Sequence, residues 1–137
     1  MVEMELSKIV IDEKRHDQLI VLKEKAGQKI LPIVIGLNEA SAIKLKISGF
    51  TPPRPLTHDL LYTTIENLEA KVDKIIIDKL QDNTFHAKIV ITTDGGKTKT
   101  IDARPSDSIA LAVRAHVTIF VEDDIIKQMD VFNKEKQ

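Results

Sequence analysis

Two stretches of the sequence follow one plan, and this repetition limits the fold more than any other feature. Residues 29–47 (KILPIVIGLNEASAIKLKI) and residues 97–115 (KTKTIDARPSDSIALAVRA) each read as a strand, a polar helix start and a helix. An offset of 68 positions aligns Glu39 with Asp107. We therefore predict a duplicated unit of three strands and one helix. The alternative, that any strand followed by a capped helix looks like this, stays open at this point.

Around this repeat, the pattern of apolar and polar residues predicts further elements. Strands are expected at residues 1–13, 18–24, 29–35, 72–80, 84–93, 97–103 and 117–121. Helices are expected at about 38–48, 57–69 and 105–116, with a short helix near the end of the chain. This order predicts an α+β fold with a mostly antiparallel or mixed sheet and helices packed on it. One domain is expected over residues 1–130, followed by a C-terminal tail at 131–137.

Single residues give more detailed predictions. Pro32 lacks an N–H group, so its strand is expected at an edge of the sheet or at a bulge. Asn38 and Thr57 are expected to cap the first two helices with their side-chain oxygens. The second helix is expected to bury one apolar stripe, which consists of Leu61, Ile65 and Leu68.

Charge and composition argue against several classes of protein. There are 20 basic and 21 acidic residues, and this net charge of −1 argues against a large electrostatic footprint on nucleic acid. Four Phe, one Tyr and no Trp argue against a broad base-stacking platform. The absence of cysteine excludes disulfides and thiolate chemistry and fits a cytoplasmic protein. No secretory signal and no apolar run of the roughly 20 residues that a membrane helix needs are found, so no membrane partner is expected.

Three segments together resemble the bifunctional nuclease (BFN) domain family. They are LPIVIGLNEASAI (31–43), RPLTHDLL (54–61) and DARPSDSIALAVR (102–114), in this order and at similar spacing. The resemblance extends over about residues 1–130. It implies nuclease activity with RNA or DNA as the partner, because plant members of the family act on both. It assigns no catalytic residue.

The first candidate site lies where the last long helix is expected to begin. Phosphodiester hydrolysis needs an activated water and stabilisation of charge on the phosphate. Asp102 and Asp107 are candidate catalytic carboxylates, and Arg104 is a candidate nucleic-acid-binding residue whose planar guanidinium suits a phosphate. The alternative is an ordinary helix start, in which Asp107 stabilises the positive end of the helix dipole and Arg104 pairs with a nearby carboxylate.

The second candidate site lies in RPLTHDLLYTTIE, residues 54–66. Helical spacing places His58 and Glu66 on one flank, with Asp59 beside them. His58 is a candidate general acid or base, Asp59 and Glu66 are candidate catalytic carboxylates, and Arg54 is a candidate phosphate-binding residue. The alternative is an ordinary polar face of a helix.

The third candidate site joins the two halves of the repeat. If the two helix starts lie close together, Glu39 and Asp107 form a carboxylate pair for a metal ion, and Mg²⁺ or another divalent cation is the expected occupant. The alternative is that Lys46 and Arg114, seven residues further along, form ion pairs between helices or subunits. No organic cofactor is expected, because the chain has no P-loop, no dinucleotide-binding glycine motif and no serine-nucleophile motif.

Two functions are compatible with these patterns. The first is a metal-assisted nuclease that hydrolyses phosphodiester bonds in RNA, DNA or both. The second is a non-catalytic homo-oligomeric binding or regulatory module, suggested by the apolar helix at 106–116 and the stiff TPPRP loop at 51–55. A homo-oligomer is expected under either function.

Overall fold

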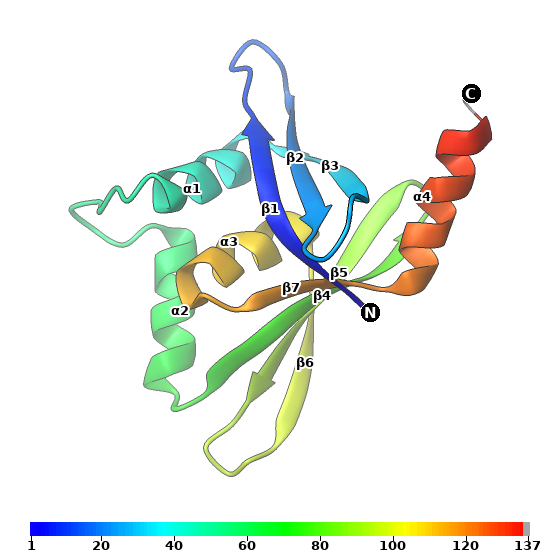
Figure 1. The fold of residues 1–137 in the computed structure, drawn as a ribbon. Helices are drawn as coiled ribbons and strands as arrows, with labels where there is room; N and C mark the ends of the chain where they lie inside the picture. Colours follow the sequence, from blue (N-terminus) through cyan, green and yellow to red (C-terminus); the bar gives the residue numbers. More distant parts are fainter. Residues whose placement is uncertain (136–137) are drawn as a thin grey trace.

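The computed structural model describes residues 1–135, and the side chains of residues 1–129. The strands are β1 (Val2–Val10), β2 (Asp17–Glu24), β3 (Ile30–Gly36), β4 (Lys71–Gln81), β5 (Thr84–Thr92), β6 (Thr98–Ala103) and β7 (Thr118–Val121). The helices are α1 (Leu37–Ile47), α2 (Thr57–Asn67), α3 (Pro105–Ala115) and α4 (Asp123–Glu135) (Figure 1). This confirms the predicted α+β class. The backbone of α4 extends into the segment expected as a tail, of which residues 136–137 lie outside the described residues.

The seven strands of residues 1–135 form one mixed sheet in the order β3-β2-β1-β7-β4-β5-β6. Neighbouring strands are antiparallel except β4 and β7, which run parallel. β7 therefore separates two three-stranded halves whose strand orders mirror each other. Each half ends in an 11-residue helix, α1 or α3, and the N-caps of these helices, Gly36 and Arg104, lie 68 positions apart. The order of elements thus repeats as the sequence predicts.

Two irregularities of the sheet agree with its sequence. Pro32 lies in β3, which is an edge strand that pairs only with β2, so its missing N–H group is tolerated. β1 contains a shift of register between Leu6 and Lys8 against β2, which is the mark of a bulge.

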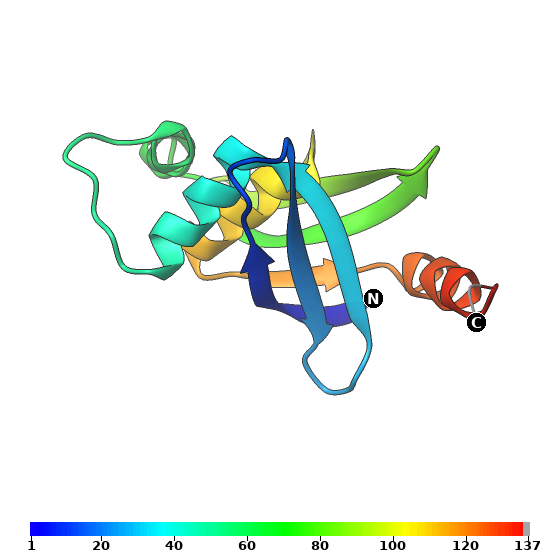
Figure 2. The same cartoon turned by 90° about the horizontal axis from the view of Figure 1, so that it is seen from above.

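Three helices cover one part of the sheet and build the core with it. Figures 1 and 2 show α1, α2 and α3 grouped on one side of the molecule, while α4 lies apart at the opposite end. In the middle of the sheet, Ile75 of β4 pairs with Ile89 of β5 and with Ile119 of β7, and all are buried. α3 adds the fully buried Ile109 and Leu111. No helix within residues 1–135 has the length and apolar character needed to cross a membrane.

The expected side-chain caps of α1 and α2 are wrong. α1 begins at Leu37, so Asn38 is already inside the helix, and α2 begins at Thr57 itself. The N-cap positions belong to Gly36 and Leu56, which offer no side-chain oxygen. Each helix instead carries an acidic residue in its first turn, which stabilises the positive end of the helix dipole without a side-chain cap.

The expected buried stripe of α2 is also wrong for two of its three residues. Ile65 is buried, but Leu61 is 36% exposed and Leu68 is 73% exposed. α2 is turned so that His58 makes a hydrogen bond and Asp59 makes an ion pair with side chains of α3. These polar contacts set the rotation of the helix, and its two leucines, Leu60 and Leu61, therefore face outward.

The row of isoleucines in the middle of the sheet gives a first prediction. Ile75→Ala is expected to lower the free energy of unfolding by about 2–5 kcal/mol, because it removes buried apolar atoms and leaves a cavity. Ile101→Ala, on the exposed edge strand β6, is the matched control and is expected to change it by less than about 0.5 kcal/mol. Urea unfolding followed by circular dichroism measures both. Equal losses in the two variants would contradict this description of the core.

Candidate active site

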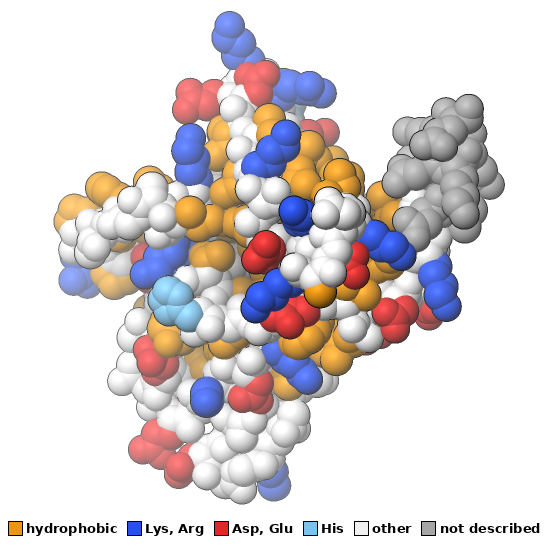
Figure 3. Space-filling model, in the orientation of Figure 1, with side chains coloured by type: hydrophobic (Ala, Val, Ile, Leu, Met, Phe, Trp, Pro, Cys, Tyr) orange, Lys and Arg blue, Asp and Glu red, His pale blue; other side chains and the backbone are white. Residues whose placement is uncertain are grey.

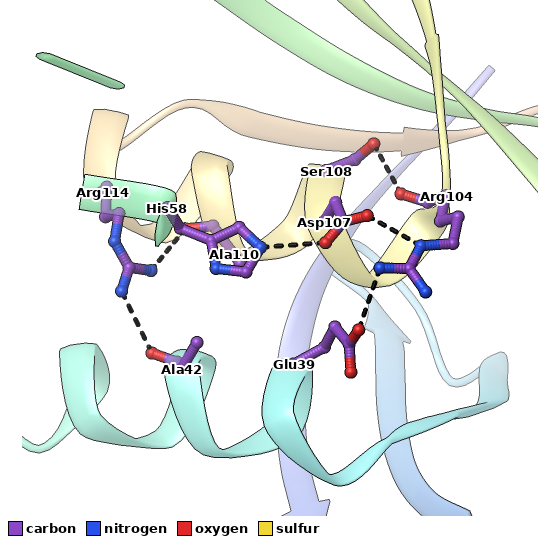
Figure 4. A network of polar contacts seen from close by, with 8 residues as sticks. All are labelled: Glu39, Ala42, His58, Arg104, Asp107, Ser108, Ala110 and Arg114. Carbon is purple, nitrogen blue, oxygen red and sulfur yellow. Dashed lines mark hydrogen bonds and ion pairs between the residues drawn. The ribbon is translucent and has the colours of Figure 1, made fainter. Parts of the chain in front are cut away.

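The starts of α1 and α3 lie side by side because these helices pack against each other. Arg104, the N-cap residue of α3, bridges them. Its Nη2 donates to Oε1 of Glu39 at 2.9 Å, and its Nε donates to Oδ2 of Asp107 at 2.8 Å (Figure 4). The two carboxylates that the repeat places at equivalent positions therefore share one guanidinium.

The third participant comes from α2. Nε2 of His58 lies 2.9 Å from Oδ1 of Asp107, and the His58 side chain is only 12% exposed. An ionised carboxylate only accepts hydrogen bonds, so Nε2 carries the proton in this pair and Nδ1 is the ring nitrogen that can accept another. His58, Asp107, Arg104 and Glu39 thus form one continuous chain of hydrogen bonds, which Figure 4 shows running from α2 across α3 to α1.

The environment of Asp107 keeps its carboxyl ionised. Burial alone would raise the pKa of Asp107, but hydrogen bonds from Arg104 and His58 outweigh burial, and the pKa lies below its ordinary value of 3.8. Asp107 is therefore a carboxylate at neutral pH. It can hold the His58 ring in one tautomer and one orientation, as a carboxylate does beside a catalytic histidine.

These side chains border an open cavity. The cavity measures about 600 Å³ and is lined by residues of α1, the loop after it, the start of α2 and the start of α3, including Asn38, Glu39, Ser41, Leu56, His58, Arg104 and Asp107. The Arg104 side chain is 66% exposed, whereas the side chains of Glu39 and Asp107 are 18% and 29% exposed. A ligand that enters this cavity would therefore meet the guanidinium in an accessible position.

A second ion pair lies beside the first but is built differently. Nε of Arg114 donates to Oδ1 of Asp59 at 2.6 Å, and the Arg114 side chain is only 3% exposed. Arg114 also donates to the carbonyl of Ala110 at 2.8 Å and to the carbonyl of Ala42 at 3.4 Å. It thereby joins α1, α2 and α3, and it forms an interhelix ion pair of the kind that the sequence left open.

Asp59 is fully engaged in this second pair. Its Oδ2 accepts a hydrogen bond from the backbone N–H of Leu56 at 2.9 Å, while its Oδ1 binds Arg114. Burial would raise the pKa of Asp59, but the Leu56 N–H and Arg114 lower it below the ordinary value. Asp59 thus stabilises the start of α2 next to His58, and it does not line the 600 Å³ cavity.

The remaining candidates lie elsewhere. Asp102 on β6 is exposed and pairs with Lys88 at 3.2 Å. Arg54 is exposed on the loop before α2 and does not line the cavity. Glu66, two turns along α2 from His58, lines a different cavity together with Tyr62. Burial, followed by the charge of Glu66, raises the pKa of Tyr62 there.

A comparison with known protein families identifies the family of this chain. The model of the bifunctional nuclease domain matches residues 20–134. The chain belongs to the bifunctional nuclease domain family. In this BFN domain the three segments that carry the family resemblance meet at one place, because 31–43 supplies Glu39, 54–61 supplies His58, and 102–114 supplies Arg104 and Asp107.

Several curated proteins are similar to this BFN domain. An uncharacterized protein of Mycobacterium tuberculosis (strain CDC 1551 / Oshkosh) is 38% identical over 128 residues, which cover 93% of this chain and 76% of the relative. Bifunctional nuclease 2 of Oryza sativa subsp. japonica is 29% identical over 114 residues, covering 81% of this chain and 35% of that protein. Bifunctional nuclease 1 of Oryza sativa subsp. indica is 22% identical over 112 residues, covering 80% of this chain and 34% of that protein.

One contributor to the site escaped the sequence reasoning. Ser108, inside α3, is buried, and its Oγ donates to the carbonyl of Arg104 at 2.9 Å. This bond one turn back along the helix helps to hold the backbone from which the Arg104 side chain projects. The available signal was a hydroxyl residue in an otherwise apolar helix, and that signal is weak because serine is common at helix starts.

The donors around Arg104 do not fit a metal ion in this arrangement. Among the described residues, no group of three or more His, Asp and Glu side chains is placed to hold one. Glu39 and Asp107 do approach each other as the repeat implies, but the guanidinium of Arg104 lies between them and takes an oxygen of each. A divalent cation at that point would have to displace Arg104.

The lowered pKa of Asp107 gives the second prediction. The folded state holds fewer protons on this carboxyl than the unfolded chain does, so its stabilisation is lost as the pH falls through the folded-state pKa. Between about pH 5 and pH 2, the free energy of unfolding is expected to fall more steeply for the wild type than for Asp107→Asn. Urea unfolding at each pH measures this, and parallel curves for the two proteins would show that Asp107 does not contribute.

Proposed function

We propose that this BFN domain hydrolyses phosphodiester bonds in RNA, DNA or both, in the cavity bordered by His58, Asp107 and Arg104. The observation that carries the proposal is the direct contact of Asp107 with both other residues, at 2.9 Å and 2.8 Å. It brings an imidazole and a guanidinium together at one open cavity, which supports the roles of base and anion-binding group that we propose for them. The names of the rice relatives, which are bifunctional nucleases, support the same substrate class.

Arg104 provides the positive charge for the phosphate. A phosphodiester is an anion, and negative charge increases on its oxygens during attack, so a guanidinium at this point favours the transition state. Nε and Nη2 of Arg104 are used by Asp107 and Glu39, which fix the plane of the group. Its remaining N–H groups are on a side chain that is 66% exposed, and they can donate to phosphate oxygens.

His58 provides the base. Its Nδ1 can remove a proton from a water molecule, whose oxygen then attacks phosphorus, and the bond from phosphorus to the leaving oxygen breaks. The imidazolium that forms is stabilised by the Asp107 carboxylate on its other nitrogen. The proton on Nδ1 can then pass to the leaving oxygen, which returns the histidine to its starting state.

The third prediction tests His58 directly. His58→Ala is expected to lower the rate of cleavage of labelled single-stranded RNA or DNA by about 10²- to 10⁴-fold, the usual contribution of a general base. His16→Ala is the matched control, because His16 is exposed on the loop between β1 and β2 and does not line the cavity. Both variants are purified in the same way, so that a contaminating nuclease appears equally in each.

The outcome separates the two functions that the sequence allows. A His58→Ala protein that folds normally and cleaves at the wild-type rate would remove His58 from the chemistry. Absence of turnover in the wild type, together with an oligomeric molar mass in light scattering, would favour the non-catalytic homo-oligomeric module instead. That alternative has one structural argument, which is the exposure of Leu60 and Leu61 on α2 and of Leu68 at its C-cap.

Magnesium assistance stays a prediction from the sequence, and its ligands would be Glu39 and Asp107. The fourth prediction follows from the position of Arg104 between them. Arg104→Ala is expected to bind Mn²⁺ or Mg²⁺ more tightly than the wild type, because the two carboxylates then lose the cation that they share. Isothermal titration calorimetry measures this, and Arg104→Ala combined with Glu39→Gln is expected to lose the gain.

Cleavage assays on the same proteins complete this test. Cleavage that EDTA abolishes and Mg²⁺ restores would establish metal assistance in the wild type. Cleavage unaffected by EDTA would leave Arg104 as the positive charge at the phosphate. Equal metal binding by Arg104→Ala and the wild type would contradict the idea that the guanidinium and a cation compete for Glu39 and Asp107.

A further inference from the structure

We propose that a second pocket, adjoining the candidate active site, binds one unstacked base of a single-stranded nucleic acid on the ring of Phe50. This inference rests on the proposed function and names a subsite and a strand preference for it. The pocket measures about 250 Å³ and includes Lys46, Phe50 and Thr63. It shares Leu45, Pro55 and Leu56 with the cavity of His58 and Arg104, so the two hollows adjoin each other, and together they are called the groove.

The end of α1 holds Phe50 in place. Gly49 has a φ of +80°, its N–H donates to the carbonyl of Lys46 at 3.1 Å, and the N–H of Phe50 donates to the carbonyl of Leu45 at 3.1 Å. This pair of bonds is the Schellman motif, which closes a helix and brings the residue after the glycine next to the last turn. The backbone position of Phe50 is therefore fixed by hydrogen bonds, although the residue lies in a loop.

The loop that follows is stiff. Three of its residues are prolines at positions 52, 53 and 55, whose rings restrict the backbone of the segment between α1 and α2. Because this loop is already restricted, it loses little conformational entropy when a ligand binds, and the entropic cost of binding is low. The groove is therefore organised before a ligand arrives.

Phe50 is exposed without an obvious structural need for exposure. In the Schellman motif, the residue after the glycine commonly packs against the helix, yet 52% of Phe50 remains accessible. Figure 3 shows hydrophobic side chains over this loop, at the left of the view. Phe50 and Pro53 of the loop are both exposed. An accessible aromatic ring beside a proposed nuclease site offers a flat apolar surface that any base can stack on.

The charges along the groove fit a nucleotide next to the proposed cleavage point. The pocket is lined by Lys46 and also by Asp59 and Arg114, which pair with each other, while Arg104 lines the adjoining cavity. Each part of the groove therefore carries a cation for a phosphate. The net charge of −1 agrees with a footprint of few phosphates. A base in a duplex is stacked and paired, and it cannot reach Phe50 without being pulled out, so single strands are preferred.

The experiment measures binding separately from cleavage. Fluorescence anisotropy with a fluorescein-labelled single-stranded oligothymidylate gives the dissociation constant of the full chain and of four variants. Phe50→Ala is expected to weaken binding by about tenfold, because one stacked base contributes a factor of that order. Phe50→Tyr is expected to restore it, and Phe50→Leu is expected to remain weak because it keeps apolar character without an aromatic ring. Leu68→Ala, at the exposed C-cap of α2, is the control and is expected to bind as the wild type does.

Each outcome of the binding measurement either supports or overturns the proposed subsite at Phe50. Equal affinity of Phe50→Ala and the wild type, or equal affinity for the oligonucleotide and its duplex, would overturn the proposal while leaving the nuclease assignment intact. Loss of affinity in Phe50→Ala without any cleavage by the wild type would support the subsite and reject the proposed hydrolysis. A change in the molar mass of Phe50→Ala in light scattering would show that a second copy covers the loop, which overturns the proposal.

Discussion

One buried guanidinium connects the three helices around the candidate active site. Removing a charge from water costs several kcal/mol, and an ion pair offsets that cost only when its hydrogen bonds are complete. Arg114 meets this condition through the carboxylate of Asp59 and the carbonyls of Ala110 and Ala42. Because Asp59 also stabilises the start of α2, the placement of His58 on that helix depends on an arginine that lies outside the cavity.

The two halves of the repeat contribute to the site in different ways. At equivalent N-cap positions, the second half carries Arg104 and the first half carries Gly36. A Cβ atom added to Gly36 would lie 2.5 Å from Oε2 of Glu39. The carboxylate of Glu39 therefore occupies the space that a side chain at position 36 would need. Gly36 of the first half thus leaves room for the Glu39 carboxylate, which accepts a hydrogen bond from Arg104 of the second half. The two halves therefore meet in one asymmetric arrangement of charged side chains.

Local sequence patterns account for much of the fold and for part of the site. Alternating residues predicted the strands, and the repeat correctly implied that Glu39 and Asp107 approach each other. The rotation of α2 could not be predicted, since Leu61 and Leu68 look like a buried stripe in isolation. It depends on His58 meeting Asp107, 49 positions later, and on Asp59 meeting Arg114, 55 positions later. Contacts over such distances in the chain leave no periodic signal, so Asp59 and Asp107 looked equally suited to catalysis.

The position of β7 has a consequence for how this chain is made. The strand lies between β1 and β4, and its pairing joins Val2 to Val121, almost the full length of the described chain. Both inner edges, those of β1 and β4, therefore remain without a neighbour until the ribosome has released the last strand, and unpaired edges can bind other chains. A nascent chain that stalls before residue 118 would lack β7, so its two half-sheets would each expose an unpaired strand edge.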